Sequence, residues 1–126
     1  LPDGLNTHVN STGSTLPSPH RLKLSLARGF AMNPGILLVS RGLDGMDRQS
    51  QLDFLLNIEQ MIGNRTLVMA TQQVSLTVRF DKIVVMEKGR IVSMGRHKDL
   101  INSCDLYGYI MNVERRVARE LWAEAE

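Results

Sequence analysis

Polar side chains that can contact a phosphate or a proton follow two apolar runs of this sequence. Ser40 and Arg41 come directly after the run 36–39, and Gln72 comes shortly after the run 66–70. Such runs are typical of buried strands in parallel sheets, whose carboxyl ends usually present functional groups. Arginine binds phosphates but accepts no proton near neutral pH, and a glutamine amide donates a hydrogen bond without shuttling a proton. The residue types are therefore compatible with a contact to an anion but do not favour acid–base catalysis.

Each of these positions also has a plain structural interpretation. Arg41 can pair with Asp44 or Asp47, and this is the interpretation that we favour over a phosphate contact. Asp47 suits the N-cap of a following helix. Gln72 suits a loop amide whose hydrogen bonds are satisfied locally. The side chains alone therefore do not decide between a binding site and ordinary loop chemistry.

A helix is predicted from the residues that precede the first apolar run. Ser18 suits the N-cap, and Pro19 suits the first helical position, where its missing N–H needs no partner. The Asn-Pro-Gly segment 33–35 ends the helix. The apolar face of the predicted helix comprises Leu22, Leu26, Ala27 and Phe30. We expect the strand 36–39 that follows to be covered on both faces.

The rest of the chain continues to alternate between helix and strand. Asp47 is predicted to open a helix that ends at 63–64, and 66–70 is predicted to be a second buried strand. The hairpin strands are predicted at 82–86 and 90–94, with Gly89 at a positive φ, and helices at 74–80, 97–101, 105–113 and 114–126. The inward-facing residues are predicted to be Leu52, Leu55, Leu56, Ile58, Ile62, Val74, Val78 and Phe80.

Composition is that of an ordinary globular domain. The 126 residues are 43% hydrophobic and 22% charged, with a formal net charge of +2. This charge is too small and too scattered for a nucleic-acid surface. The single Cys104 excludes an internal disulfide, and His8 and His97 lack partners at metal-ligand spacing. No apolar run is long enough to span a bilayer, and we expect an excised segment because Leu1 is not an initiator Met.

The order and spacing of these motifs resemble the second half of the nucleotide-binding domain of ABC transporters. In that family a signature loop, LSGGQ, opens a helix that ends in an ALAR-type sequence, and a Walker B strand ends in Asp-Glu. The matching segments are LPSPH at 16–20, SLAR at 25–28, ILLVSR at 36–41, DGMD at 44–47, TLVMATQQVS at 66–75 and FDKIVVMEKGRIVSMGRHKDL at 80–100. The resemblance extends from residue 1 to about 113 and is greatest to bacterial exporters of toxins and peptides.

The resemblance places Pro17, Ser18, Pro19 and His20 at the signature loop. In the family, this loop offers a serine side chain and glycine N–H groups to the γ-phosphate bound by the opposite subunit. The two prolines remove two N–H donors, so this sequence departs from the pattern. Ser18 and His20 can still offer polar contacts, but we favour Ser18 as an N-cap and His20 as a solvated helix residue.

The resemblance also assigns the Walker B, D-loop and switch positions. Ser40 and Arg41 stand where the family has the aspartate that holds the Mg²⁺ water shell and the glutamate that polarises the attacking water. Asp47 matches the D-loop aspartate, and Gln72 stands at the switch histidine. No catalytic residue is therefore intact in this chain, and no activity is expected from the chain in isolation.

The fold class that follows is α/β. The resemblance implies a partial P-loop NTPase fold of the ABC ATPase kind, with a small, mostly parallel sheet flanked by helices and a C-terminal antiparallel hairpin. Residues 1–15 are expected to be an irregular connection that ends the helical subdomain, 16–113 the C-terminal half of the nucleotide-binding domain, and 114–126 a terminal helix. No GxxxxGK[ST] loop occurs in the sequence, so ATP and Mg²⁺ are expected only in a full-length protein or a partner.

The resemblance supports three functional hypotheses. The first is a catalytically degenerate part of an exporter, which couples to or regulates ATP-driven transport at the cytoplasmic face of the bacterial inner membrane. Its partners would be another nucleotide-binding domain and the transmembrane domains, with no nucleic acid. The second is a working ATPase completed by an upstream half, and the third is an interaction module without enzymatic activity. In each case we expect an uncovered sheet edge and apolar face, and hence dimers, swapped elements or aggregates of the isolated chain.

Overall fold

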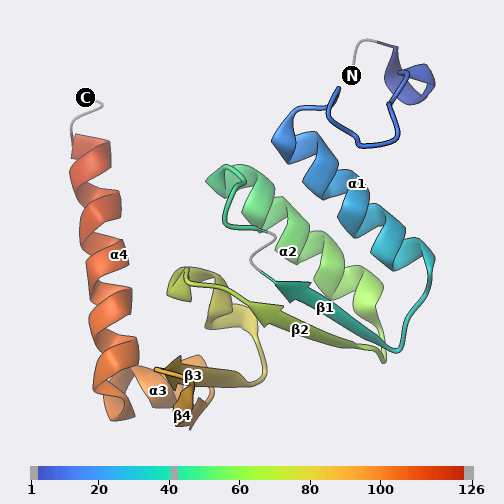
Figure 1. The fold of residues 1–126 in the computed structure, drawn as a ribbon. Helices are drawn as coiled ribbons and strands as arrows, with labels where there is room; N and C mark the ends of the chain where they lie inside the picture. The colour runs from blue at the N-terminus through green and yellow to red at the C-terminus, as the bar shows by residue number, and fades with distance from the viewer. Residues whose placement is uncertain (1–2, 41–42, 124–126) are drawn as a thin grey trace. The chain divides into compact units, whose positions relative to one another are not determined.

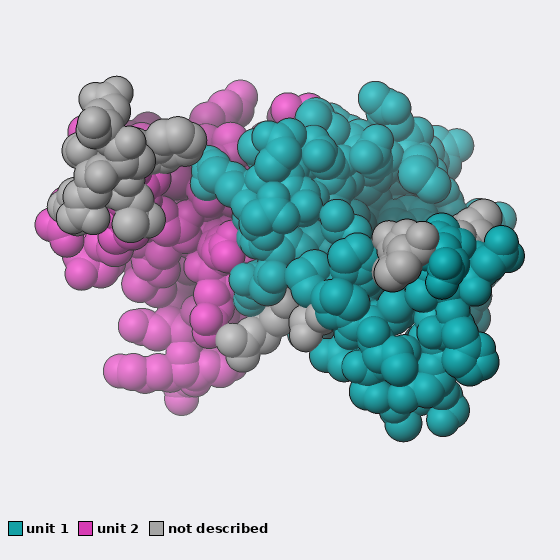
Figure 2. Space-filling model, turned by 90° about the horizontal axis from the view of Figure 1, so that it is seen from above, with its two compact units in different colours: residues 1–70 teal, residues 71–126 magenta. Residues whose placement is uncertain are grey.

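The computed structural model describes residues 3–40 and 43–123, apart from the side chains of 5, 18 and 120–123. The chain divides into two compact units, Leu1–Ala70 and Thr71–Glu126 (Figure 2). The first unit contains η1 (Gly4–Asn6), α1 (Ser18–Ala31), β1 (Ile36–Ser40), α2 (Arg48–Ile62) and β2 (Thr66–Ala70) (Figure 1). The second contains η2 (Val74–Arg79), β3 (Ile83–Glu87), β4 (Arg90–Gly95), α3 (His97–Ser103) and α4 (Asp105–Ala123).

Helix α1 begins one residue earlier than the sequence indicates. Pro17 is the N-cap and Ser18 is already helical, so the prediction of Ser18 as N-cap is wrong. The reason lies in the backbone: the Pro17 carbonyl accepts hydrogen bonds from the N–H groups of His20 at 3.0 Å and Arg21 at 3.1 Å. Pro19 lies in the first turn, where its missing N–H leaves no bond unmade.

The turn after α1 is held by its neighbours. Asn33 adopts a φ of 49°, in the left-handed region that asparagine tolerates better than most residues. The Arg65 Nη1 donates to the Asn33 Oδ1 at 2.9 Å, and the Thr66 N–H donates to the Gly35 carbonyl at 3.0 Å. The predicted helix stop at 33–35 is therefore confirmed, and these bonds place β1 beside β2.

The two parallel strands form a sheet that is covered on one face only. They pair in register, with Leu38 opposite Val68. Ile36 is 63% exposed, Leu38 73% and Val68 49%, whereas Val39 is buried. The prediction that both strands are buried on both faces is wrong, because the face that carries Leu38 and its partner Val68 is exposed. The predicted uncovered apolar face is confirmed.

Helix α1 packs against the covered face. A Cβ added to Gly29 would lie 3.3 Å from the Leu37 Cδ1, closer than most side-chain contacts allow. Leu22, Leu26 and Phe30 are half-buried, which matches the predicted face, but Ala27 is exposed. A glycine at position 29 therefore lets the helix approach the strand.

Helix α2 presents a face that is shifted from the predicted one. Leu55 and Ile58 are buried as expected, but Leu52 is 39% exposed and Leu56 46% exposed. Their place is taken by Gln51, which is 3% exposed and donates from Nε2 to the Leu43 carbonyl at 2.8 Å. A polar side chain was not expected inside, but burial is tolerated because its hydrogen bond is satisfied.

The second unit has its own core between the hairpin and the last two helices. The hairpin turns at Lys88 and Gly89, with φ values of 48° and 76°, so the predicted positive φ at Gly89 is confirmed. Strands β3 and β4 are antiparallel, as predicted. The buried cluster comprises Ile83, Val85, Leu100, Cys104, Tyr107 and Met111.

Two helices of this unit differ from expectation. The short segment η2 is a 3-10 helix in which Leu76 is buried, while Val78, predicted to face inward, is 43% exposed. Three residues per turn place different side chains on the inner face than an α-helix does. Val74 and Phe80 pack against the core, as predicted. Helix α4 continues unbroken through 114 to Ala123, so 114–123 extend it rather than begin a new helix.

Candidate functional site

The residues that the resemblance assigns to the signature loop lie at the N-terminal end of α1. Pro17, Pro19 and His20 are exposed, while the Ser18 side chain lies outside the described part of the structure. Pro19 has no backbone N–H, so the first turn of α1 offers fewer donors to an anion than an ordinary helix N-terminus does. His20, predicted to be solvated, is exposed as expected.

Of the two positions that the resemblance assigns to Walker B, Ser40 lies at the carboxyl end of β1. Ser40 is exposed and pairs in register with Ala70 at the end of β2. Arg41 lies outside the described residues, and its expected pairing with Asp44 or Asp47 remains a prediction. At the one Walker B position that the structure describes, the strand ends in a hydroxyl, which offers no negative charge to a metal ion.

The loop after β1 is anchored from inside. Leu43 is 1% exposed and Met46 7%, so both apolar side chains of this loop are buried. The buried Gln51 amide adds a hydrogen bond to the Leu43 carbonyl. Together these contacts hold Asp47 at the start of α2.

Asp47 caps α2, as the sequence predicts. Its Oδ1 accepts a hydrogen bond from the Ser50 N–H at 2.9 Å. This backbone donor, followed by the Ser50 hydroxyl, lowers the pKa of the Asp47 carboxyl below its ordinary value of 3.8, with a smaller contribution from the charge of Lys23. The carboxylate is therefore ionised at neutral pH and is engaged by its own helix.

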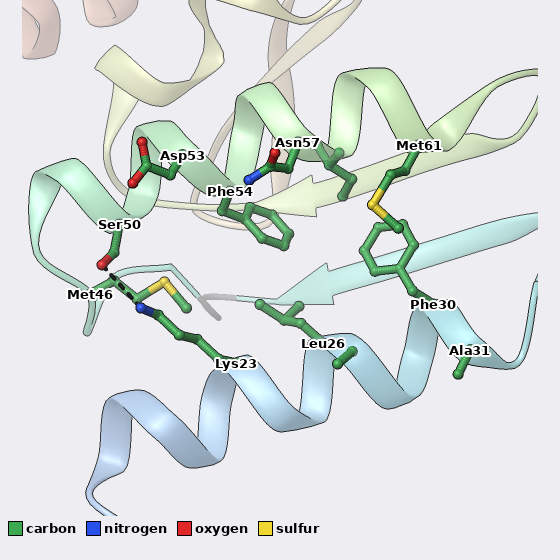
Figure 3. Close-up of a pocket in the computed structure, with 12 residues that line it drawn as sticks. Lys23, Leu26, Phe30, Ala31, Met46, Ser50, Asp53, Phe54, Asn57 and Met61 are labelled. Carbon is green, nitrogen blue, oxygen red and sulfur yellow. Dashed lines mark hydrogen bonds between the residues drawn. The ribbon is translucent and has the colours of Figure 1, made fainter. Parts of the chain in front are cut away.

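Lys23 links this cap to α1. Its Nζ donates to the Ser50 Oγ at 3.3 Å (Figure 3). Asp47, at the start of α2, and Lys23, on α1, are thus both bonded to Ser50. Sequence reasoning missed both Lys23 and Ser50, because the two residues lie 27 positions apart and neither belongs to a motif.

A pocket of about 630 Å³ lies between α1 and α2. Figure 3 shows Phe30, Phe54 and Met61 in the wall of this pocket, with the Lys23–Ser50 hydrogen bond near one end. Asp53 also lines the pocket and accepts a hydrogen bond from the Gln49 Nε2 at 2.8 Å. Its mostly apolar lining suits a hydrophobic group and lacks the cluster of donors that a triphosphate needs.

Gln72, which the resemblance assigns to the switch position, lies in the second unit. Gln72 is exposed, in a loop where the Gln73 N–H donates to the Thr71 Oγ1 at 3.0 Å. The following N–H groups, of Val74 and Ser75, donate to the Glu114 carboxylate at 2.6 and 2.8 Å. Sequence reasoning missed Glu114, because its partners lie 40 and 39 residues away along the chain and it belongs to no motif.

His97 in the second unit contacts a buried tyrosine. The His97 Nδ1 lies 2.9 Å from the Tyr107 hydroxyl, which is 3.0 Å from the Thr77 Oγ1. His97 also begins α3, as predicted. Among residues 3–40 and 43–123, no group of three or more His, Cys, Asp or Glu side chains could hold a metal ion.

No protein-family model matches the chain, but individual proteins are similar to it. Over 115 residues it is 33% identical to the leukotoxin translocation ATP-binding protein of Mannheimia haemolytica and 31% identical to the alpha-hemolysin translocation ATP-binding protein of Escherichia coli. A solved bacterial Atm1-family ABC exporter with ATP bound matches 90% of the chain with a TM-score of 0.83 and 27% identity. This chain is homologous to part of the ABC exporters. The resemblance drawn from its motifs is therefore confirmed.

The homologous region is a small part of each ABC exporter. The matches cover 90% of this chain but only 16% of the two translocation proteins and 20% of the solved exporter chain. No helix in the described part of this exporter homologue is long and apolar enough to cross a membrane. The roles that the family assigns to Ser40, Asp47 and Gln72 remain predictions.

Proposed function

We propose that this chain is the C-terminal part of an ABC exporter nucleotide-binding domain in which the catalytic positions have been replaced. The observation that carries the proposal is Ser40: a strand that matches the exporter framework ends in a hydroxyl where hydrolysis needs a carboxylate. Such a domain couples to the transport cycle or regulates it, and does not itself hydrolyse ATP.

The geometry of the first unit supports a retained framework with altered chemistry. Asp47 caps α2, and the Lys23–Ser50 hydrogen bond joins that cap to α1. These contacts maintain the loop that would face a second nucleotide-binding domain. Pro17 and Pro19, in contrast, are poor ligands for a phosphate because neither has an N–H group.

The proposed setting is a membrane transporter. The relatives named as translocation ATP-binding proteins support a place at the cytoplasmic face of the bacterial inner membrane. ATP and Mg²⁺ would be bound by an upstream half that carries a phosphate-binding loop, or by the partner. The partners would be another nucleotide-binding domain and the transmembrane domains of an exporter.

The size and location of the natural polypeptide test this proposal. An antibody against this chain should detect, in source cells, a membrane-associated product several times longer than 126 residues. A product no longer than this chain, found in the soluble fraction, would contradict the proposal. That result would favour an interaction module, for which the exposed Ile36 and Leu38 offer an apolar contact surface.

A further inference from the structure

The loop that carries Gln72 is followed by a short 3-10 helix whose start is held by a distant residue. The first N–H groups of such a helix have no partner within it. In η2 two of them, of Val74 and Ser75, donate to the two carboxylate oxygens of Glu114 at 2.6 and 2.8 Å. Glu114 lies 40 residues further along the chain, on α4.

This arrangement uses both oxygens of one side chain. Hydrogen bonds from N–H groups to a carboxylate are charge-assisted and are shorter and stronger than those between neutral groups. Glu114 is half-buried, so water competes with these bonds less than at an exposed site.

Helix α4 holds η2 at a second point on the same face. Tyr107, which precedes Glu114 by two helical turns, places its hydroxyl 3.0 Å from the Thr77 Oγ1. The same hydroxyl lies 2.9 Å from the His97 Nδ1. A Cβ added to Gly108 would lie 3.2 Å from the Ile101 carbonyl oxygen, so α4 also sits close against α3. The helix is therefore well placed to fix η2 in position.

We propose that Glu114 is a positioning residue for Gln72. Its carboxylate fixes the N-terminus of η2, and with it the short loop in which Gln72 lies two residues before Val74. A displacement of α4 would then also move Gln72, the residue that the proposed function places at the switch position. The switch role of Gln72 rests on that proposed function, whereas the positioning of its loop by Glu114 does not.

Amide hydrogen exchange in the natural full-length protein, without nucleotide, tests the proposal. Glu114→Ala should raise exchange at Val74 and Ser75 at least about tenfold, and should also raise it at Gln73. Glu114→Gln keeps one acceptor oxygen and should give an intermediate rate. Glu87→Gln, the same chemical change at an exposed residue of the hairpin, should leave these amides unchanged.

Two results would overturn the proposal. If exchange at Gln73 does not change in Glu114→Ala, Glu114 caps η2 without positioning the loop. If exchange at Leu100, in the core of the second unit, rises as much as at Val74, Glu114 acts through general stability. Because no nucleotide is present, failure of the positioning proposal is distinguishable from failure of the proposed function.

Discussion

The Tyr107 hydroxyl offers a sharp test of how the second unit is held together. Tyr107 is 2% exposed, and its hydroxyl oxygen is within hydrogen-bond distance of the His97 Nδ1 at 2.9 Å and the Thr77 Oγ1 at 3.0 Å. Tyr107→Phe keeps the ring in the core and removes both bonds. At about 0.5–1.5 kcal/mol for each hydrogen bond, the free energy of unfolding should fall by about 1–3 kcal/mol.

The chain supplies a matched control on the same helix. Tyr109 is 69% exposed, and Tyr109→Phe should change the free energy of unfolding by less than about 0.5 kcal/mol. Urea unfolding followed by circular dichroism measures both variants, at one protein concentration because self-association shifts the midpoint. Equal losses in the two variants would refute the role assigned to the Tyr107 hydroxyl.

Two further predictions concern the first unit. The lowered pKa of Asp47 means that its contribution to stability is complete above its ordinary value of 3.8 and is lost as the pH falls below that value through the folded pKa. Asp47→Asn keeps a capping oxygen but cannot titrate, so urea midpoints at about pH 7 and about pH 3 should differ less in this variant than in the wild type; an unchanged difference would contradict the cap. Leu38→Lys, on the uncovered face of the sheet, should reduce self-association in light scattering, whereas Met32→Lys, at an exposed apolar residue beyond the sheet, should not. A monomeric wild type at high concentration would show that this face does not drive association.

Local signals predicted the elements well. The Asn-Pro-Gly turn, the cap at Asp47 and the positive φ at Gly89 depend on neighbouring residues, and the structure has all three. The order of helices and strands followed from the same kind of signal. The N-cap of α1 failed by one residue, because the Pro17 carbonyl rather than a side chain begins the hydrogen-bond ladder.

Burial and long-range contacts were harder to predict. A continuous apolar run reads as a strand covered on both faces, but Leu38 is exposed because cover depends on what packs beside the sheet. Gln51 is buried with its amide bonded to the Leu43 carbonyl, a contact that the hydrophobic periodicity of the sequence does not predict. The partners of Lys23 and Glu114 lie 27 and 40 residues away, so only the folded chain brings them together.

ATP hydrolysis by the purified full-length protein decides whether the proposed loss of catalysis is real. We expect turnover no higher than in a reaction without protein, and no change in Gln72→Ala, because Ser40 supplies no carboxylate at the end of β1. Turnover well above that background, with a loss of at least about tenfold in Gln72→Ala, would contradict a catalytically degenerate domain. It would show instead that the replaced positions support a working exporter ATPase.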